Sequence, residues 1–196
     1  HKNEDWKKIK ILGSCIEKPK DISSRKTYSI DSAEKLNHIF RSNKISHNTK
    51  LKVFKTYCAP IFLFNSELWA ITKEICNEID AFQRKMIGRY VLKREYPNII
   101  SNEKLYERTK QEKWTTTIEK KRLSFMAHVL RLDSKTPARQ AYEYAKEKYI
   151  CRRGRQKTTM LKSLEATLTK LNTTMHQFEN MVTDKEKVHN LIKKLK

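Results

Sequence analysis

The near absence of glycine is the feature that most constrains how this chain can fold. Only 3 of its 196 residues are Gly, and 4 are Pro. Tight β-turns depend on residues that tolerate a positive φ, so a β-rich fold with many hairpins would need more of them. Hydrophobic residues still make up 38% of the chain, which is enough to bury a core and argues against full disorder. We therefore expect an all-α protein.

Apolar stripes at helical spacing recur along the sequence and support this expectation. Residues that typically cap helices precede these stripes at Asp31, Ser46, Thr72, Ser101, Thr136 and Thr183. Asp31 and Thr183 are each followed by Glu three residues later, which matches the capping box. Pro60 lies inside one stripe and predicts a kink. The pattern predicts a bundle of about seven to nine helices, with at most a small β element before residue 17.

We expect three parts along the chain. They are a connecting segment over residues 1–30, a helical domain over 31–132, and a basic loop with C-terminal helices over 133–196. Residues 51–100 have the smallest excess of positive charge, so we expect the centre of the core there, made by Phe54, Cys58, Ile61, Trp69, Ile79, Phe82 and Met86. Because the sequence begins with His1 and no Met, we expect it to be part of a longer or trimmed polypeptide.

The charge balance indicates the class of partner. There are 43 Lys and Arg against 22 Asp and Glu, a net charge of +21. Such an excess attracts polyanions, with nucleic acid the first candidate, ahead of an anionic membrane surface or an acidic protein. A Lys-rich surface that only maintains solubility is the plain alternative. The longest apolar stretch, residues 59–64, is far shorter than the ~20 residues that span a bilayer, so no membrane-spanning segment is expected. The apolar helix faces are numerous enough to pack against one another, so no membrane partner is expected either.

Metal and redox chemistry have little support in the sequence. Cys15, Cys58, Cys76 and Cys151 form no Cys-x-x-Cys pair and have no ligand spacing relative to the histidines. We therefore predict no metal site and no cofactor, and free thiols in a reducing intracellular compartment.

Catalytic patterns are also missing. The Asp residues never occur as a close pair that would hold two Mg²⁺ ions, and no phosphate-binding Gly-rich motif or nucleophile elbow is present. Glu67 and His128 are polar residues in apolar surroundings, and both are better explained by helix packing. We expect no catalytic residues and no enzymatic activity from this chain alone.

Two groups of cations are candidate nucleic-acid contacts. The first is the basic loop, in which a Gly separates the cations Arg152, Arg153, Arg155 and Lys157. Guanidinium groups bind phosphate through paired hydrogen bonds, and Lys adds a point charge. The second group, on one predicted helix and mostly facing outward, is Lys120, Lys121 and Arg122. The alternatives are a solvated loop or a localisation signal for the first group and an ordinary wet helix face for the second.

Strings spread over nearly the whole chain resemble one known family. They lie, in order, at residues 11–14 (ILGS), 51–69 (LKVFKTYCAPIFLFNSELW), 81–86 (AFQRKM), 101–105 (SNEKL), 122–132 (RLSFMAHVLRL) and 152–160 (RRGRQKTTM). They are similar to the end of the palm, the thumb and the C-terminal region of non-LTR retrotransposon (LINE-type) reverse transcriptases. The chain departs from that pattern at Asn65, where the family has Gly, and at Met160 and Val188, where it has Trp.

The resemblance implies a role in holding template RNA and the primer duplex. The family's catalytic carboxylates lie in an upstream Ala-Asp-Asp motif, which this chain does not contain. The resemblance therefore implies a non-catalytic nucleic-acid-binding fragment that acts in the nucleus. The alternative is a retroelement-derived structural RNA-binding subunit of a ribonucleoprotein, with protein partners, such as an organellar (mitochondrial) ribosome.

Overall fold

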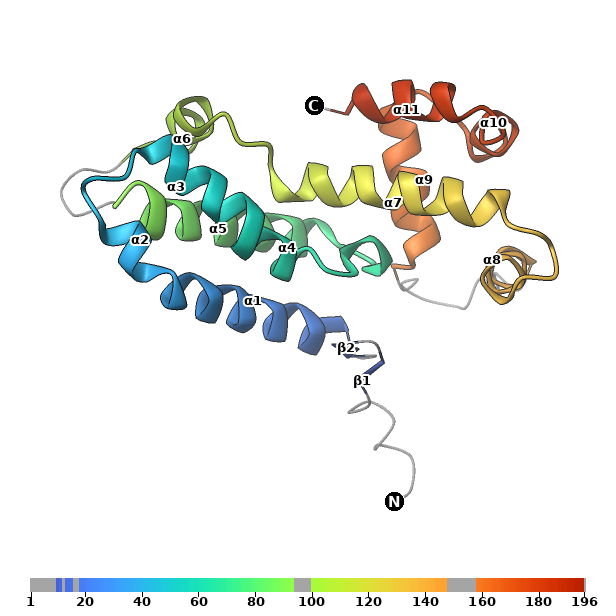
Figure 1. Cartoon of the computed structure of the whole chain (residues 1–196). Coiled ribbons are helices and arrows are strands. Elements are labelled where there is room, and N and C mark those ends of the chain that lie inside the picture. Colours follow the sequence, from blue (N-terminus) through green and yellow to red (C-terminus); the bar gives the residue numbers. More distant parts are fainter. Residues whose placement is uncertain (1–9, 12, 16–17, 94–99, 148–157, 196) are drawn as a thin grey trace, which may run out of the picture. The chain divides into compact units, whose positions relative to one another are not determined.

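The all-α prediction is confirmed by the structure, a computed structural model that describes residues 10–11, 13–15, 18–93, 100–147 and 158–195 (Figure 1). The described residues are 75% helical and form ten helices, close to the predicted number, when helical segments that follow one another without a break are counted together and the short 3-10 turn at Ser66–Leu68 is left out. By contacts it divides into two compact units. Unit 1 comprises His1–Ser66 and Lys73–Thr115, and unit 2 comprises Glu67–Thr72 and Thr116–Lys196. These units do not coincide with the predicted boundaries after residues 30 and 132.

The described part of unit 1 begins with the predicted small β element. It is a hairpin of two short antiparallel strands, with Gly13 at φ 81° in its turn, a conformation that glycine adopts without strain. The elements of unit 1 are β1 Lys10–Ile11, β2 Ser14–Cys15, α1 Lys18–Lys35, α2 Asn37–Arg41, α3 His47–Val53, the π-helical turn η2 Phe54–Cys58, α4 Ala59–Phe62, α5 Lys73–Met86, the π-helical turn η4 Ile87–Val91 and α6 Asn102–Thr109.

The predicted capping box at Asp31 is wrong, because α1 continues to Lys35. Ile22, Ser29 and Ala33 follow one another at helical spacing and are all buried. This buried face packs along η2 and α4, and the Ser29 hydroxyl donates to the Cys58 carbonyl at 3.0 Å. Tertiary packing of one face therefore overrides the local signal for a new helix start at Asp31.

Pro60 is accommodated without ending its helix. The turn before it, η2, closes with the Ala59 N–H donating to the Phe54 carbonyl five residues back. Pro60 then stands in the first turn of α4, where its missing N–H is tolerated. The predicted interruption takes the form of a widened turn, a common way for a helix to absorb such a defect.

Aromatic rings fill the core of unit 1. Trp114 stacks against Phe62 at a centroid distance of 4.6 Å and against Phe54 at 6.1 Å, and Phe82 packs against it at 5.9 Å. The predicted core residues Phe54, Cys58, Ile79, Phe82 and Met86 are all buried. Ile61 is only half-buried, since Phe62 points inward instead. Trp69 is buried but belongs to unit 2.

Unit 2 has an aliphatic core. Its elements are the second part of the 3-10 turn η3 Ser66–Leu68, then α7 Trp114–Arg131 from Thr116 onward, α8 Pro137–Glu147, α9 Met160–Lys170, α10 Met175–Met181 and α11 Lys185–Lys193. Leu123 and Met126 of α7 pack with Leu164 and Leu168 of α9. These apolar stripes of α7 and α9 therefore form ordinary core.

Helix starts match the sequence signals in most but not all cases. Ser46 and Ser101 accept hydrogen bonds from backbone N–H groups three residues later, as predicted. At α11 the predicted cap is off by one residue. Asp184, not Thr183, accepts from the N–H groups of Glu186 and Lys187, because a carboxylate is the stronger acceptor at a helix N-terminus.

Candidate nucleic-acid interface

The basic loop predicted as the main contact lies outside the described residues. Arg152, Arg153, Arg155 and Lys157 therefore have no structural description. The helices on either side of the loop are described: α8 ends at Glu147, and α9 starts after its cap Thr159, whose hydroxyl accepts from the Lys162 N–H. The loop stays a prediction.

Two of the three cations in the second predicted group, on α7, make polar contacts within unit 2. Arg122 is 2% exposed, and its guanidinium donates to the Trp69 carbonyl at 2.8 Å. The outward orientation predicted for Arg122 is therefore wrong, because successive residues of a helix point in directions about 100° apart. Lys121 Nζ lies 3.8 Å from a Glu67 carboxylate oxygen, and Lys120 and Lys121 are both half-buried.

These contacts explain Glu67, one of the two polar residues considered for acid–base chemistry. It forms an ion pair within unit 2, and together with the Arg122–Trp69 bond this pair fixes segment 67–72 to α7. His128, the other candidate, is exposed on α7. Within the described ranges, no group of three or more His, Cys, Asp or Glu could hold a metal ion.

A cation-rich cavity in unit 1 is a feature that no sequence pattern predicts. This α2–η4 cavity has a volume of about 520 Å³ and is lined by Glu34, Asn37, Phe40, Arg41, Arg89, Tyr90 and Lys93. Three of these side chains are cationic and one is anionic. The cations come from the end of α2, from η4 and from the residues just after it, and up to 52 residues separate them in the sequence. A local sequence motif could therefore not have predicted that these cations share one cavity.

Hydrogen bonds fix one wall of the α2–η4 cavity. The Glu34 carboxylate accepts from the Tyr90 hydroxyl at 2.6 Å and from Arg89 at 3.0 Å. Burial, and then the hydrogen bond to Glu34, raise the pKa of Tyr90 to about 12, so the phenol keeps its proton and continues to donate. The Tyr90 ring packs against Phe40 at a centroid distance of 5.8 Å. The Tyr90 hydroxyl therefore orients the Glu34 carboxylate, and Arg89 neutralises its charge.

The other two cations that line the cavity, Arg41 and Lys93, have no carboxylate partner among the described residues. Lys93 Nζ donates to the Arg41 carbonyl and to Asn43, both neutral acceptors. The exposed Arg41 guanidinium makes no ion pair with a carboxylate of the described residues. Nearby in α3, burial and then repulsion from Lys93 lower the pKa of Lys50, which is 2% exposed. Positive charge is thus in local excess around this cavity.

Two of the family-like strings meet in unit 1. Ser14, from the string at residues 11–14, accepts from the Asn65 side-chain amide at 3.0 Å and from Arg25 at 3.2 Å. Arg25 also donates to the Gly13 carbonyl and lies over the Phe64 ring at 4.5 Å. Asn65 has φ 53°, so it tolerates the backbone conformation expected where the family has Gly. These residues join the hairpin to the end of α4.

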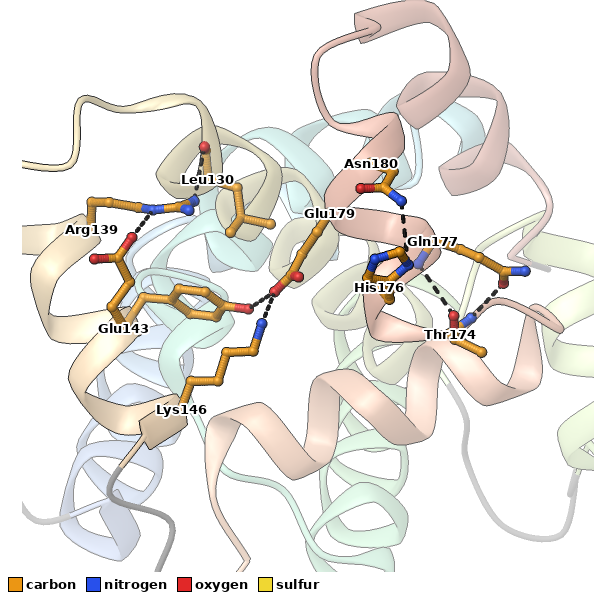
Figure 2. A network of polar contacts seen from close by, with 10 residues as sticks. Leu130, Arg139, Glu143, Lys146, Thr174, His176, Gln177, Glu179 and Asn180 are labelled. Carbon is orange, nitrogen blue, oxygen red and sulfur yellow. Dashed lines mark hydrogen bonds and ion pairs between the residues drawn. The ribbon is translucent and has the colours of Figure 1, made fainter.

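In unit 2, polar contacts link α8 to α10 (Figure 2). Glu179 accepts from the Tyr142 hydroxyl at 2.6 Å and from Lys146 at 2.7 Å. Burial and the bond to Glu179 raise the pKa of Tyr142. Although burial alone would raise the pKa of Glu179, its bonds to Lys146 and Tyr142 outweigh that effect and lower it. A cavity of about 410 Å³ beside this network is lined by two Lys and two Glu, so it offers no clear excess of charge.

Comparison with known proteins gives no match: no family model, no curated protein and no solved structure corresponds to this chain. The resemblance to reverse transcriptases therefore stays a prediction based on the strings themselves. None of the helices in the described part of the chain has the length and apolar composition needed to cross a membrane.

Proposed function

We propose that this chain binds RNA or an RNA–DNA duplex through the phosphate backbone, as a thumb and C-terminal fragment of a retroelement reverse transcriptase, and has no catalytic residues of its own. The observation that carries the proposal is the distribution of charge. Unit 1 contains 24 Lys and Arg against 13 Asp and Glu, and unit 2 contains 19 against 9. Even complete internal pairing of every carboxylate would leave each unit with a large positive excess, which favours a polyanionic partner.

The proposed contacts differ in their structural support. The basic loop, with Arg152, Arg153 and Arg155, remains the main proposed contact of unit 2. Lys120 and Lys121 are secondary, since both are half-buried, and Arg122 is excluded because it is buried in unit 2. Phosphate contacts carry little sequence information, so binding should depend weakly on base sequence.

The test is the salt dependence of RNA binding, measured by fluorescence anisotropy with the full chain. The triple variant Arg152→Ala, Arg153→Ala, Arg155→Ala should flatten the slope of log binding constant against log salt concentration by about 2 to 3. Each phosphate contact releases counterions when it forms, so a variant with fewer contacts releases fewer of them. It should weaken binding similarly for unrelated RNA sequences.

A matched control removes three cations elsewhere. Lys104, Arg108 and Lys185 are exposed and belong to none of the proposed contacts. Their triple Ala variant lowers the net charge equally, so it measures the general loss of attraction. Equal changes in the two triple variants would contradict the loop assignment, and a parent chain that does not bind RNA at physiological salt would contradict the function itself.

A further inference from the structure

The α2–η4 cavity has the composition of an anion site rather than of a structural ion-pair cluster. Of its four charged side chains, Arg89 is the one that pairs with Glu34, at 3.0 Å. This leaves Arg41 and Lys93 facing the same cavity without a carboxylate partner among the described residues. The comparable cavity beside α8 and α10 has two Lys and two Glu, with Lys146 bonded to Glu179. The two cavities therefore differ in net charge more than in size.

The donors of the cavity also suit a tetrahedral oxyanion. A guanidinium presents a planar set of N–H donors that can bond two phosphate oxygens at once. Arg89 remains 63% exposed at its side chain even while paired, so it can reach a ligand without leaving a buried site. An ammonium has three donors, and Lys93 uses two of them on Arg41 and Asn43. One donor of Lys93 therefore remains for a ligand.

We propose that the α2–η4 cavity binds a phosphate group, with Arg41 and Lys93 as its direct contacts and Arg89 as the third. The phosphate is either a diester of bound nucleic acid or a free phosphate, since both present the same oxygens. In its diester form the proposal rests on the proposed function and gives unit 1 its own contact with the backbone. In its free form it stands independently of RNA binding.

Glu34 distinguishes a binding role from a structural one. In a phosphate site this carboxylate repels the ligand and occupies Arg89, so Glu34→Gln should tighten binding by about two- to fivefold, the size of one exposed charge interaction. If the cluster only holds α1 to η4, the gain should be no larger than that of Glu103→Gln, which removes an exposed carboxylate of unit 1 away from the cavity and so measures the general effect of charge. The size of the change relative to this control is therefore informative.

The experiment compares Arg41→Ala with Arg108→Ala in the full chain. Both positions are exposed arginines of unit 1, and Arg41 makes no ion pair with another residue of the described ranges, so both variants should fold like the parent by circular dichroism. Arg41→Ala should weaken binding of a labelled 20-nucleotide RNA by about three- to tenfold and flatten its salt slope by about one. Arg108→Ala should do much less.

A second arm uses inorganic phosphate alone. The parent chain and Arg108→Ala should broaden its ³¹P resonance, and Arg41→Ala should not. An effect of Arg41→Ala on RNA only identifies the ligand as the nucleic-acid diester, and an effect on phosphate only identifies a free phosphate. If the parent binds no RNA, the proposed function fails while the phosphate arm still decides the cavity. Equal behaviour of the two variants toward both ligands overturns the proposal.

Discussion

The cations of α7 and the cations of the α2–η4 cavity have opposite roles in the structure. Arg122 stands in a run of three basic residues, yet it is buried and bonded to the Trp69 carbonyl. Arg41 and Lys93 have no such run around them, yet they face one cavity. Adjacent cations on a helix point in different directions, whereas distant ones can converge. A charge run in a sequence is therefore a poor guide to charge available for binding.

The largest expected effect tests the internal role of Arg122. Arg122→Ala removes a buried donor, leaves the Trp69 carbonyl without that bond and opens a void, so it should cost about 2 to 4 kcal/mol of unfolding free energy. Urea unfolding followed by circular dichroism measures it. Arg108→Ala, at an exposed position, should change stability by less than about 0.5 kcal/mol.

The RNA salt slope of the folded Arg122→Ala variant sharpens the comparison further. Because the guanidinium is buried, the slope should equal that of the parent. A stable variant whose slope is flatter by about one would mean that Arg122 contacts phosphate, and the distinction between the two groups of cations would be lost.

A smaller effect is expected where unit 2 pairs its charges internally. Tyr142→Phe removes the hydroxyl that donates to Glu179 at 2.6 Å, while the ring and its packing remain. The expected cost is about 1 to 2 kcal/mol, since the acceptor is a carboxylate but keeps its bond to Lys146. Urea unfolding would again measure it, and a cost near zero would show that solvent replaces the bond.

The smallest effect is the pH dependence of that network. The folded-state pKa of Glu179 is lowered from its ordinary value of 4.5, so its contribution to stability is fully present above pH 4.5 and is lost as the pH falls through the lower folded value. The difference in melting temperature between the parent and Glu179→Gln should therefore narrow below pH 4.5. A difference that widens on acidification would contradict the ionised network.

Much of the fold could be predicted because its signals are local. The scarcity of Gly, the caps at Ser46 and Ser101 and the stripe through Ile79, Phe82 and Met86 each act within a few residues of chain. The failures have a common cause. Asp31 carries a valid capping pattern, but packing of the buried face around Ser29 and Ala33 keeps α1 intact, and this packing depends on residues far away in the sequence.

The candidate site was less predictable for the same reason. Arg41 and Lys93 are 52 residues apart, and each alone is an ordinary surface cation. Only the packing of α2 against η4 places them at one cavity. The prediction for Arg122 was wrong for a related reason. The run of three basic residues indicates a charged helix face, but it does not show that one of these cations bonds the carbonyl of the distant Trp69.

The widened turn η4 has a consequence for how this cavity is encoded. A π-helical turn spans one residue more than an α-helical turn, as the bond from the Leu92 N–H to the Ile87 carbonyl records. Removing any one residue from the turn would restore ordinary α-helical winding and rotate the later residues of the chain by roughly 100°. Arg89, Tyr90 and Lys93 face the cavity in this register. The position of these groups thus depends on the number of residues in the turn. Deletion of Gly88, which does not line the cavity, would leave every lining residue in the sequence but would still disrupt the cavity.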